Sequence, residues 1–458
     1  LQCFVRGGVK FETGMHFIGS ASKGQIIDRM MHYFGLRDDL VLSPLDACAY
    51  NTVDFGGDKF GYALGKEAFA EKMAGYFPSQ KDAIYRYVSI IEDIARVSSI
   101  RSLTSEDRNI ADNSEYQTQP INAVMDSLFT DPLLKNVLVG DLPLYAARYG
   151  RTPFALHAFI MDFYNNSSYR IVGGSDAISS ALIRNIEAMG GKVLTCAKAH
   201  RIVCDDTKAT GVETEDGRFY VADYVISTIH PKRMVELLDT KLIRPAYRSR
   251  INSIPDTSSV FSLYVKFREN TVPYMNTNYF RYNGNSPWGC EEYTPSSWPK
   301  GFIYMHMCHC QNPVWAKGGI VMSYMNMDEV AGWMGTKVGR RGEDYEEFKK
   351  NRAQRLIASV EKCFPGFASS IESYYTATPL TYFDYTGTEA GSIYGISKDV
   401  NLGPAGRVMY RTKIPNLLLA GQNVNSHGIM GVIVGTMLTC AELVPSEKLY
   451  RQILEADI

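Results

Sequence analysis

The sequence LAGQN at residues 419–423 and the sequence HGIMGVI at residues 427–433 define the architecture of this chain. The run from Asn416 to Gly421 predicts a buried strand that ends in a turn. A short loop follows, and we expect a helix to begin at Gly431. The start of a helix presents free backbone N–H groups and about half a positive charge, so this corner predicts an anion site.

The anion at this corner could be a reduced flavin, which carries negative charge on its N1 and C2 oxygen atoms. Gly431 would let the backbone approach the flavin closely, because glycine has no Cβ atom. Two other interpretations stay open. The corner could be a tight strand–helix contact without a ligand, or Gly431 and Gly435 could form a GxxxG pair that packs two helices together.

A second candidate segment, Phe11-Glu12-Thr13-Gly14-Met15-His16, lies near the N-terminus. Alone it is a weak signal, since a single histidine on an apolar segment is typical of a core residue. The sequence has no Gly-x-Gly-x-x-Gly after a strand and no Walker-type loop. We expect the dinucleotide fingerprint directly upstream of Leu1, in a βαβ unit of about 40 to 50 residues.

The region from residue 173 to residue 227 has the pattern of a nucleotide-binding architecture. A helix is predicted from Asp176 to Met189, with Ser175 as its N-cap and Gly190 at its end. A strand around Val193 should follow. Further strands are expected on both sides of turns at 205–208 and 216–217 and, last, at 224–227.

Two long regions have a different pattern. Residues 24–160 are predicted to be mostly helical, with one helix from Gln80 to Val97 after Pro78. Between residues 258 and 330, apolar and polar residues alternate, which predicts an antiparallel sheet with one solvent-facing side. A charged helix is expected from Glu343 to Cys363.

Composition excludes several classes of protein. The chain has 458 residues, 45% apolar and 21% charged, with a formal net charge of -1. These values are typical of a globular protein and predict no nucleic-acid partner. The apolar run from Ile429 to Leu443 is shorter than the ~18 residues of a membrane-spanning helix, and we interpret it as a buried helix.

The cysteines predict neither a disulfide framework nor a metal centre. There are nine, an odd number, without any Cys-x-x-Cys pair, which indicates a reducing compartment. His306, Cys308, His309 and Cys310 could be considered as zinc ligands. Because a second, distant pair of ligands is not evident, we interpret them as residues of a packed strand.

Taken together, these segments resemble the family of FAD-dependent oxidoreductases that includes retinol saturase, phytoene desaturase and carotenoid isomerase. The resemblance runs nearly from end to end. It is carried by residues 11–19, 173–175, 222–227, 378–381, 394–395 and 419–431. These segments in this order are specific for the superfamily, and less specific for any one substrate.

The resemblance implies an α/β fold, with an FAD/NAD(P)-binding Rossmann-like domain that lacks its first βαβ unit. A substrate domain of antiparallel sheet and helices would complete it. The FAD domain would consist of residues 1–22, 168–240 and 400–458. The substrate domain would consist of residues 23–167 and 241–399.

The resemblance also implies which residues bind FAD. Gly14 and Met15 would lie near the isoalloxazine ring, and Ala199 would hold the adenine through its backbone, where relatives more often have valine. Gly421 and Gln422 would line the ribityl and pyrophosphate region, although an acidic residue is commoner there. Three further residues would cap the flavin edge: Gly431, Val432 and Ile433.

The implied reaction is hydride transfer between flavin N5 and a carbon of a long apolar polyene, in the direction of saturation or desaturation. NAD(P) is a possible electron partner, and the catalytic acid or base stays open. Two alternatives are a carotenoid cis–trans isomerase and a prenyl-binding protein that resembles the Rab GDP-dissociation inhibitors. We expect a tunnel with aromatic walls, and a cytoplasmic or peripheral-membrane location.

Overall fold

The computed structural model describes residues 1–98 and 115–456. Its largest element is a seven-stranded sheet with the strand order β16-β12-β15-β14-β13-β5-β6. All neighbours in it are antiparallel except β13 and β5, which run parallel. The strands are β5 (Asn51–Phe55), β6 (Asp58–Tyr62), β12 (Ser259–Phe267), β13 (Asn278–Tyr282), β14 (Gly301–His306), β15 (Gly318–Met325) and β16 (Ile371–Ala377).

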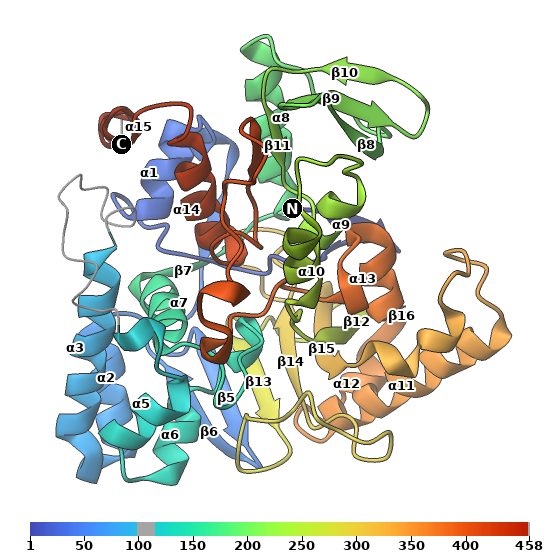
Figure 1. Cartoon of the computed structure of the whole chain (residues 1–458). Coiled ribbons are helices and arrows are strands. Elements are labelled where there is room, and N and C mark those ends of the chain that lie inside the picture. Colours follow the sequence, from blue (N-terminus) through green and yellow to red (C-terminus); the bar gives the residue numbers. More distant parts are fainter. Residues whose placement is uncertain (99–114, 457–458) are drawn as a thin grey trace.

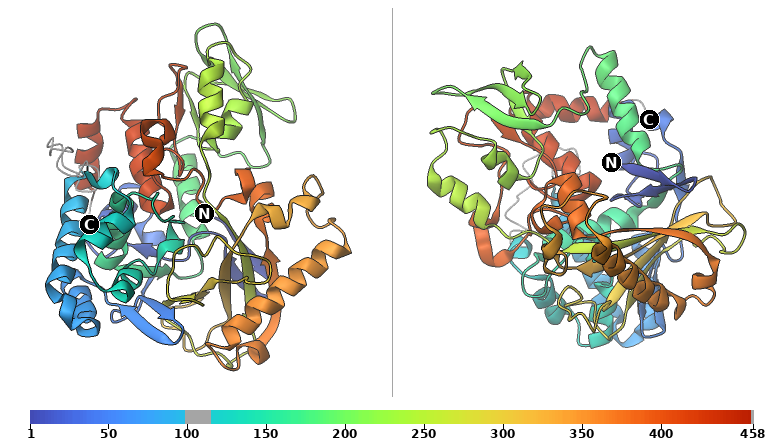
Figure 2. Two further views of the ribbon diagram at one scale, coloured as in Figure 1. Left: turned by 60° about the horizontal axis from the view of Figure 1, so that its bottom comes forward. Right: turned by 90° about the vertical axis from the view of Figure 1, so that its right-hand side faces the viewer.

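Both faces of this sheet are buried, so the predicted solvent-facing side is wrong. Along β12, Phe261, Leu263 and Val265 point into one core, while Val260 and Tyr264 point into the other. The first core is closed by α11 (Glu343–Glu361) and α12 (Phe367–Ser370), which lie on the opposite side from the helical block (Figure 2). Alternation along a strand therefore separates two apolar environments here, because helices cover both sides.

The other face of the sheet packs against a block of helices. These are α2 (Lys66–Tyr76), α3 (Lys81–Val97), α5 (Ile121–Leu128), α6 (Pro132–Leu138) and α7 (Phe154–Asn166). The helix predicted at Gln80–Val97 is confirmed by α3, whereas the hairpin of β5 and β6 was not expected in this region. At its centre, the His157 ring bridges the hydroxyl groups of Tyr87 and Tyr145, each at 2.7 Å.

A second core joins residues that are far apart in the sequence. Helices α1 (Ile26–Tyr33), α8 (Asp176–Ala188) and α14 (Gly428–Cys440) share it, as Met30, Ile178 and Val434 show. Figure 1 shows α14 beside α1, although they come from opposite ends of the chain. The remaining elements here are β3 (Ile18–Gly19), β4 (Leu42–Pro44), β7 (Ser168–Ile171) and α15 (Ser446–Leu454).

A third core holds a small parallel pair, β11 (Val225–Ser227) and β17 (Leu417–Leu419), and a three-stranded meander. The meander, at the top of Figure 1, confirms the predicted turns at 205–208 and 216–217. Its strands are β8 (Ala199–Cys204), β9 (Ala209–Thr214) and β10 (Phe219–Val221). Two helices complete this part, α9 (Pro231–Glu236) and α10 (Pro245–Ser253).

The structure differs in two details from the prediction for the helix at residues 176–189 and the strand after it. Ser175 is the N-cap residue of α8, but its hydroxyl does not cap the helix. Instead the N–H of Ser175 donates to Glu12 Oε1 at 2.6 Å, and its hydroxyl donates to the other carboxylate oxygen. Gly190 ends the helix as predicted, with a φ of +83°, whereas the strand expected around Val193 is absent from the described residues.

The N-terminal hairpin lies against the sheet. It consists of β1 (Cys3–Arg6) and β2 (Val9–Glu12), and Phe11 is buried within the core that also holds Tyr264. One further helix, α13 (Pro379–Thr386), follows β16 and begins with a capping box between Thr378 and Thr381. Over the described residues, we find no helix that combines the length and apolarity needed to span a membrane.

Leu263→Ala tests whether the face of the sheet toward α11 is a buried core. Leu263 has no exposed surface, so the variant should lose about 2–5 kcal/mol of unfolding free energy through lost burial and a cavity. Urea denaturation followed by circular dichroism measures this. Met189→Ala is the control, because Met189 is 80% exposed and should change stability little. Equal, small effects in both variants would contradict a core on this face.

Candidate functional site

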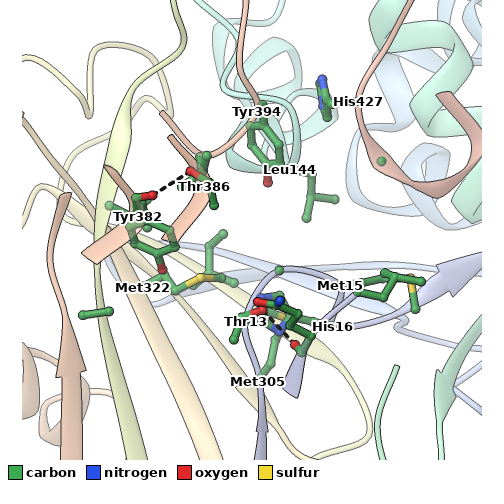
Figure 3. Close-up of a pocket in the computed structure, with 18 of the residues that line it drawn as sticks. Thr13, Met15, His16, Leu144, Met305, Met322, Tyr382, Thr386, Tyr394 and His427 are labelled. Carbon is green, nitrogen blue, oxygen red and sulfur yellow. Dashed lines mark hydrogen bonds between the residues drawn. The ribbon is translucent and has the colours of Figure 1, made fainter. Parts of the chain in front are cut away.

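A large cavity lies between the sheet and the start of α14. Its volume is about 1470 Å³, which exceeds the ~300–1,000 Å³ of common small-molecule pockets. Figure 3 shows Tyr382, Met322 and His16 around one side of it, and Tyr394 and His427 across from them. Its wall includes residues from the segments 1–17 and 422–433 and from strands of the large sheet, together with residues of several helices and loops.

The start of α14 forms one wall of the cavity. The helix begins at Gly428, so the predicted start at Gly431 is three residues too late. Gly428 has a φ of +73°, and a Cβ atom there would meet nothing within 4 Å. No described side chain caps the helix, and Gly428 and Ile429 line the cavity. The first turn thus presents its backbone N–H groups next to the open space.

Gly431 is required by packing. A Cβ atom there would lie 2.6 Å from the carbonyl carbon and oxygen of Ser426, which is too close for any side chain. At Gly435, by contrast, the nearest atom would be at 3.5 Å, an ordinary contact. The loop before α14 therefore folds back onto the helix at Gly431, and this close approach fixes the direction of the helix start.

Strand β17 and α14 are held together by side-chain hydrogen bonds. Thr439 Oγ1 donates to the Leu419 carbonyl oxygen at 2.7 Å. In the loop between them, Asn423 Oδ1 accepts the N–H of Ile396 at 2.9 Å. The first bond holds α14 against β17, and the second ties the loop to residue 396, so the helix start holds a fixed place at the cavity.

The structure brings most of the predicted FAD-binding residues to this cavity. The wall includes Gly14, Met15, Gln422, Val432 and Ile433. The lining residues do not include Gly421 and Gly431, which lie just behind the wall within the same segment. Ala199 lies apart from it, at the beginning of β8 in the meander. The adenine contact implied for Ala199 thus stays a prediction.

Two residues of the wall had no role assigned from sequence. His427 is the N-cap residue of α14, and its ring stacks on Tyr394, with the centroids 4.3 Å apart and the planes at 31°. Burial and the charge of Lys398 lower the pKa of His427 to about 4, so the imidazole is neutral at pH 7. Its position directly before the glycine-rich helix start was the available signal.

Gly431→Val should abolish retention of the FAD that the resemblance implies. Valine would push Ser426 away and displace the helix start that faces the cavity. Bound flavin, measured by its absorbance after gel filtration of the whole protein, checks this. Gly435→Ala is the matched control and should retain FAD. If Gly431→Val bound flavin as tightly as the wild type, the helix start would not be part of the flavin site.

Comparisons with known proteins agree with the sequence resemblance. All-trans-retinol 13,14-reductase of Rattus norvegicus is 25% identical in an alignment that covers 98% of this chain and 80% of that protein. The chloroplastic prolycopene isomerase 2 of an Oncidium hybrid cultivar is 21% identical in an alignment that covers 83% of this chain and 66% of that protein. The predicted resemblance to this group of proteins is confirmed.

Solved structures show the fold. An oxidoreductase from Methanosarcina mazei superposes with a TM-score of 0.60 at 12% identity, covering 95% of this chain and 89% of that one. This likeness confirms the predicted α/β fold class. The family model of flavin containing amine oxidoreductases matches residues 2–440. The chain therefore belongs to the flavin-containing amine oxidoreductase family and is an FAD-dependent oxidoreductase.

Proposed function

We propose that this FAD-dependent oxidoreductase transfers hydride to or from carbon in a long apolar polyene, of the retinol or carotenoid kind. The single observation that carries the proposal is the cavity of about 1470 Å³ that extends from the α14 start along the sheet. Its size leaves room for a second, long molecule beside a flavin ring. The retinol reductase and prolycopene isomerase relatives support the same substrate class.

The residues present fit a flavin at one end of the cavity. The uncapped start of α14 offers N–H groups and a positive helix end, which suit the anionic edge of a reduced ring. Gly14 leaves open space where a Cβ would stand, and Met15 beside it faces the cavity (Figure 3). When bound, the flavin supplies the hydride chemistry, and the protein supplies position and electrostatics.

We also propose the remaining FAD contacts on this basis. Val432 and Ile433 would cap the flavin edge together with Gly431, while Gly421 and Gln422 would face the ribityl and pyrophosphate region. Ala199 would contact the adenine through its backbone. The division into an FAD domain of residues 1–22, 168–240 and 400–458 and a substrate domain of residues 23–167 and 241–399 belongs to the same proposal.

The walls of the cavity favour an apolar substrate although many of them are tyrosines. The hydroxyl groups are used within the protein: Tyr382 pairs with Ser262 Oγ at 2.6 Å, Tyr394 donates to the Pro143 carbonyl at 3.1 Å, and Tyr282 donates to the Gly140 carbonyl at 2.6 Å. These rings line the cavity. Aromatic rings bury much area at low entropic cost, as a rigid conjugated chain requires.

Methionines line further parts of the cavity. Met305 and Met322 come from the sheet, and Met15 comes from the N-terminal segment, as Figure 3 shows. Their flexible thioether chains adapt to irregular apolar shapes. At another edge of the cavity Tyr385 is 70% exposed, beside Lys349 and Lys350. We propose that this edge contacts a membrane surface peripherally, from which a polyene would enter.

We propose His427 as the group that exchanges a proton with the substrate. Removing hydrogen from a CH–CH bond would release a hydride, which a bound flavin would accept, and a proton, which would require a base; saturation would be the reverse. The neutral His427 imidazole lies beside the flavin end of the cavity and can accept that proton. Tyr394 fixes the ring by stacking, and the pKa of the Tyr394 hydroxyl is raised by burial.

An anaerobic reoxidation assay tests the polyene proposal. The FAD-loaded enzyme is photoreduced, and retinol or a carotene is added. We expect the flavin to be reoxidised while the polyene absorbance falls. Reoxidation by small polar alkenes, with none by polyenes, would reject this substrate class. Turnover of amines by the oxidised enzyme would instead favour the chemistry named in the family description.

The same assay separates the two alternatives. A carotenoid cis–trans isomerase would change the polyene isomer without net reoxidation of the flavin. A prenyl-binding protein like the Rab GDP-dissociation inhibitors would bind an apolar chain while holding no flavin, so its preparations would be colourless. Reoxidation that requires NADP⁺ or NAD⁺ in place of the polyene would identify NAD(P) as the electron partner.

His427→Gln should lower turnover by about 10²-fold or more, because glutamine cannot exchange a proton. Flavin content should stay unchanged. In the wild type, hydrogen removal requires the neutral imidazole, so the rate should be flat above pH 5 and fall as the pH drops through about 4. This decrease should disappear in the variant. A variant with wild-type turnover and the same pH profile would remove His427 from the mechanism.

A further inference from the structure

A second, smaller cavity lies on the other side of β2. Its volume is about 110 Å³, the size of a small ion rather than of a cofactor. Arg170 of β7 lines it and is only 2% exposed. Its terminal nitrogens donate to the His16 carbonyl, the Thr277 carbonyl and Asn278 Oδ1, at 3.1, 3.2 and 2.9 Å. Each of these acceptors is neutral, so the guanidinium charge is not compensated by them.

Arg170 differs in this respect from other buried arginines of the chain. Arg341 pairs with Asp384, and Arg352 pairs with Glu329. No carboxylate within the described part of the chain forms an ion pair with Arg170, and its Nε atom has no hydrogen-bond acceptor. An uncompensated buried charge is costly, and it is commonly stabilised by a counter-ion.

Two unpaired imidazole nitrogens line the same cavity. His16 Nδ1 and His309 Nδ1 are buried and have no hydrogen-bond partner. Burial and the charge of Arg170 lower the pKa of His16 to about 3, so this ring is neutral and can donate one N–H. Lys317 lines the opening with its exposed side chain. Arg170 Nε, the two imidazoles and Lys317 thus come together around one small space.

The acidic residue of the cavity is already engaged. Glu12 accepts the N–H of Ser175 at 2.6 Å and both the hydroxyl of Ser175 and the thiol of Cys3. Burial raises the pKa of Glu12, while these hydrogen bonds act in the opposite direction. Lys10 at the same opening is paired with Asp176 at 3.0 Å. The charge that these contacts leave unbalanced is positive.

We propose that this cavity, which is lined by Arg170, His16, His309 and Lys317, binds a small oxyanion such as phosphate. The site is separate from the proposed polyene site, although His16 lines both cavities. A tetrahedral anion would accept hydrogen bonds from Arg170 Nε and the His16 imidazole, and Lys317 would attract it to the opening. Such charge-assisted bonds are the strong class of hydrogen bond.

Isothermal calorimetry with inorganic phosphate at constant ionic strength tests the site in the whole protein, and thermal unfolding gives a second readout. We expect saturable binding at about one ion per chain and a rise of the unfolding temperature with phosphate. Arg170→Gln should weaken binding roughly tenfold or more. Lys317→Gln, an exposed change that leaves the fold intact, should weaken it roughly threefold. Neither readout depends on flavin or turnover.

Arg352→Gln is the matched control, since it removes a buried arginine that does not line the cavity and should leave phosphate affinity unchanged. Phenyl phosphate distinguishes a free ion from the anionic end of a larger molecule: binding of both indicates the latter, and binding of phosphate alone the former. No saturable phosphate binding by the wild type would overturn the proposal. If Arg170→Gln does not fold, wild-type affinity in Lys317→Gln overturns it.

Discussion

The structure depends on one constraint, that the seven-stranded sheet must be covered on both faces. Strands β12, β14 and β15 carry apolar residues on each side, and neither side can face water. Helices α11 and α12 cover one side. On the other side the helical block covers only part of the sheet, and the cavity begins where that cover ends. The part of the sheet that borders the cavity includes Tyr264, Met305 and Met322. A continuous apolar wall for a long molecule thus follows from the way the sheet is packed.

Much of this arrangement could be predicted from local patterns, and the exceptions have physical reasons. Helix α3 and the meander have strong periodicity and turn signals. The start of α14 was placed too late because no capping side chain marks Gly428 as the first residue of the helix, which has a φ of +73°. Ser175 looked like a cap, yet Glu12 from a distant strand competes for its hydroxyl. The hairpin of β5 and β6 lies among helices, and its pairing with β13 is a long-range contact.

Some of the functional residues could also be predicted from local motifs, whereas others depend on how the chain packs. Gly14, Met15, Gln422, Val432 and Ile433 belong to contiguous motifs, so family resemblance found them. His427 stood within such a motif, but its stacking on Tyr394 depends on a loop that folds in from residue 394. Arg170 was not predicted from the sequence as a site residue. What marks it as one is that it forms no ion pair with a carboxylate among the described residues, and this can only be seen in the fold. A sequence pattern shows which groups are present, whereas only packing shows which of them are left unpaired.

The cavity wall combines segments that are far apart in the sequence, and this affects how the protein is made. Residues 1–17 leave the ribosome well before residues 422–433. At about 5–20 residues per second, roughly 20–80 seconds separate the two. During that time the apolar strands of the sheet lack part of their cover, and the nascent chain exposes apolar surface. Until residues 422–433 complete the wall, this exposed apolar surface makes the growing chain prone to aggregation.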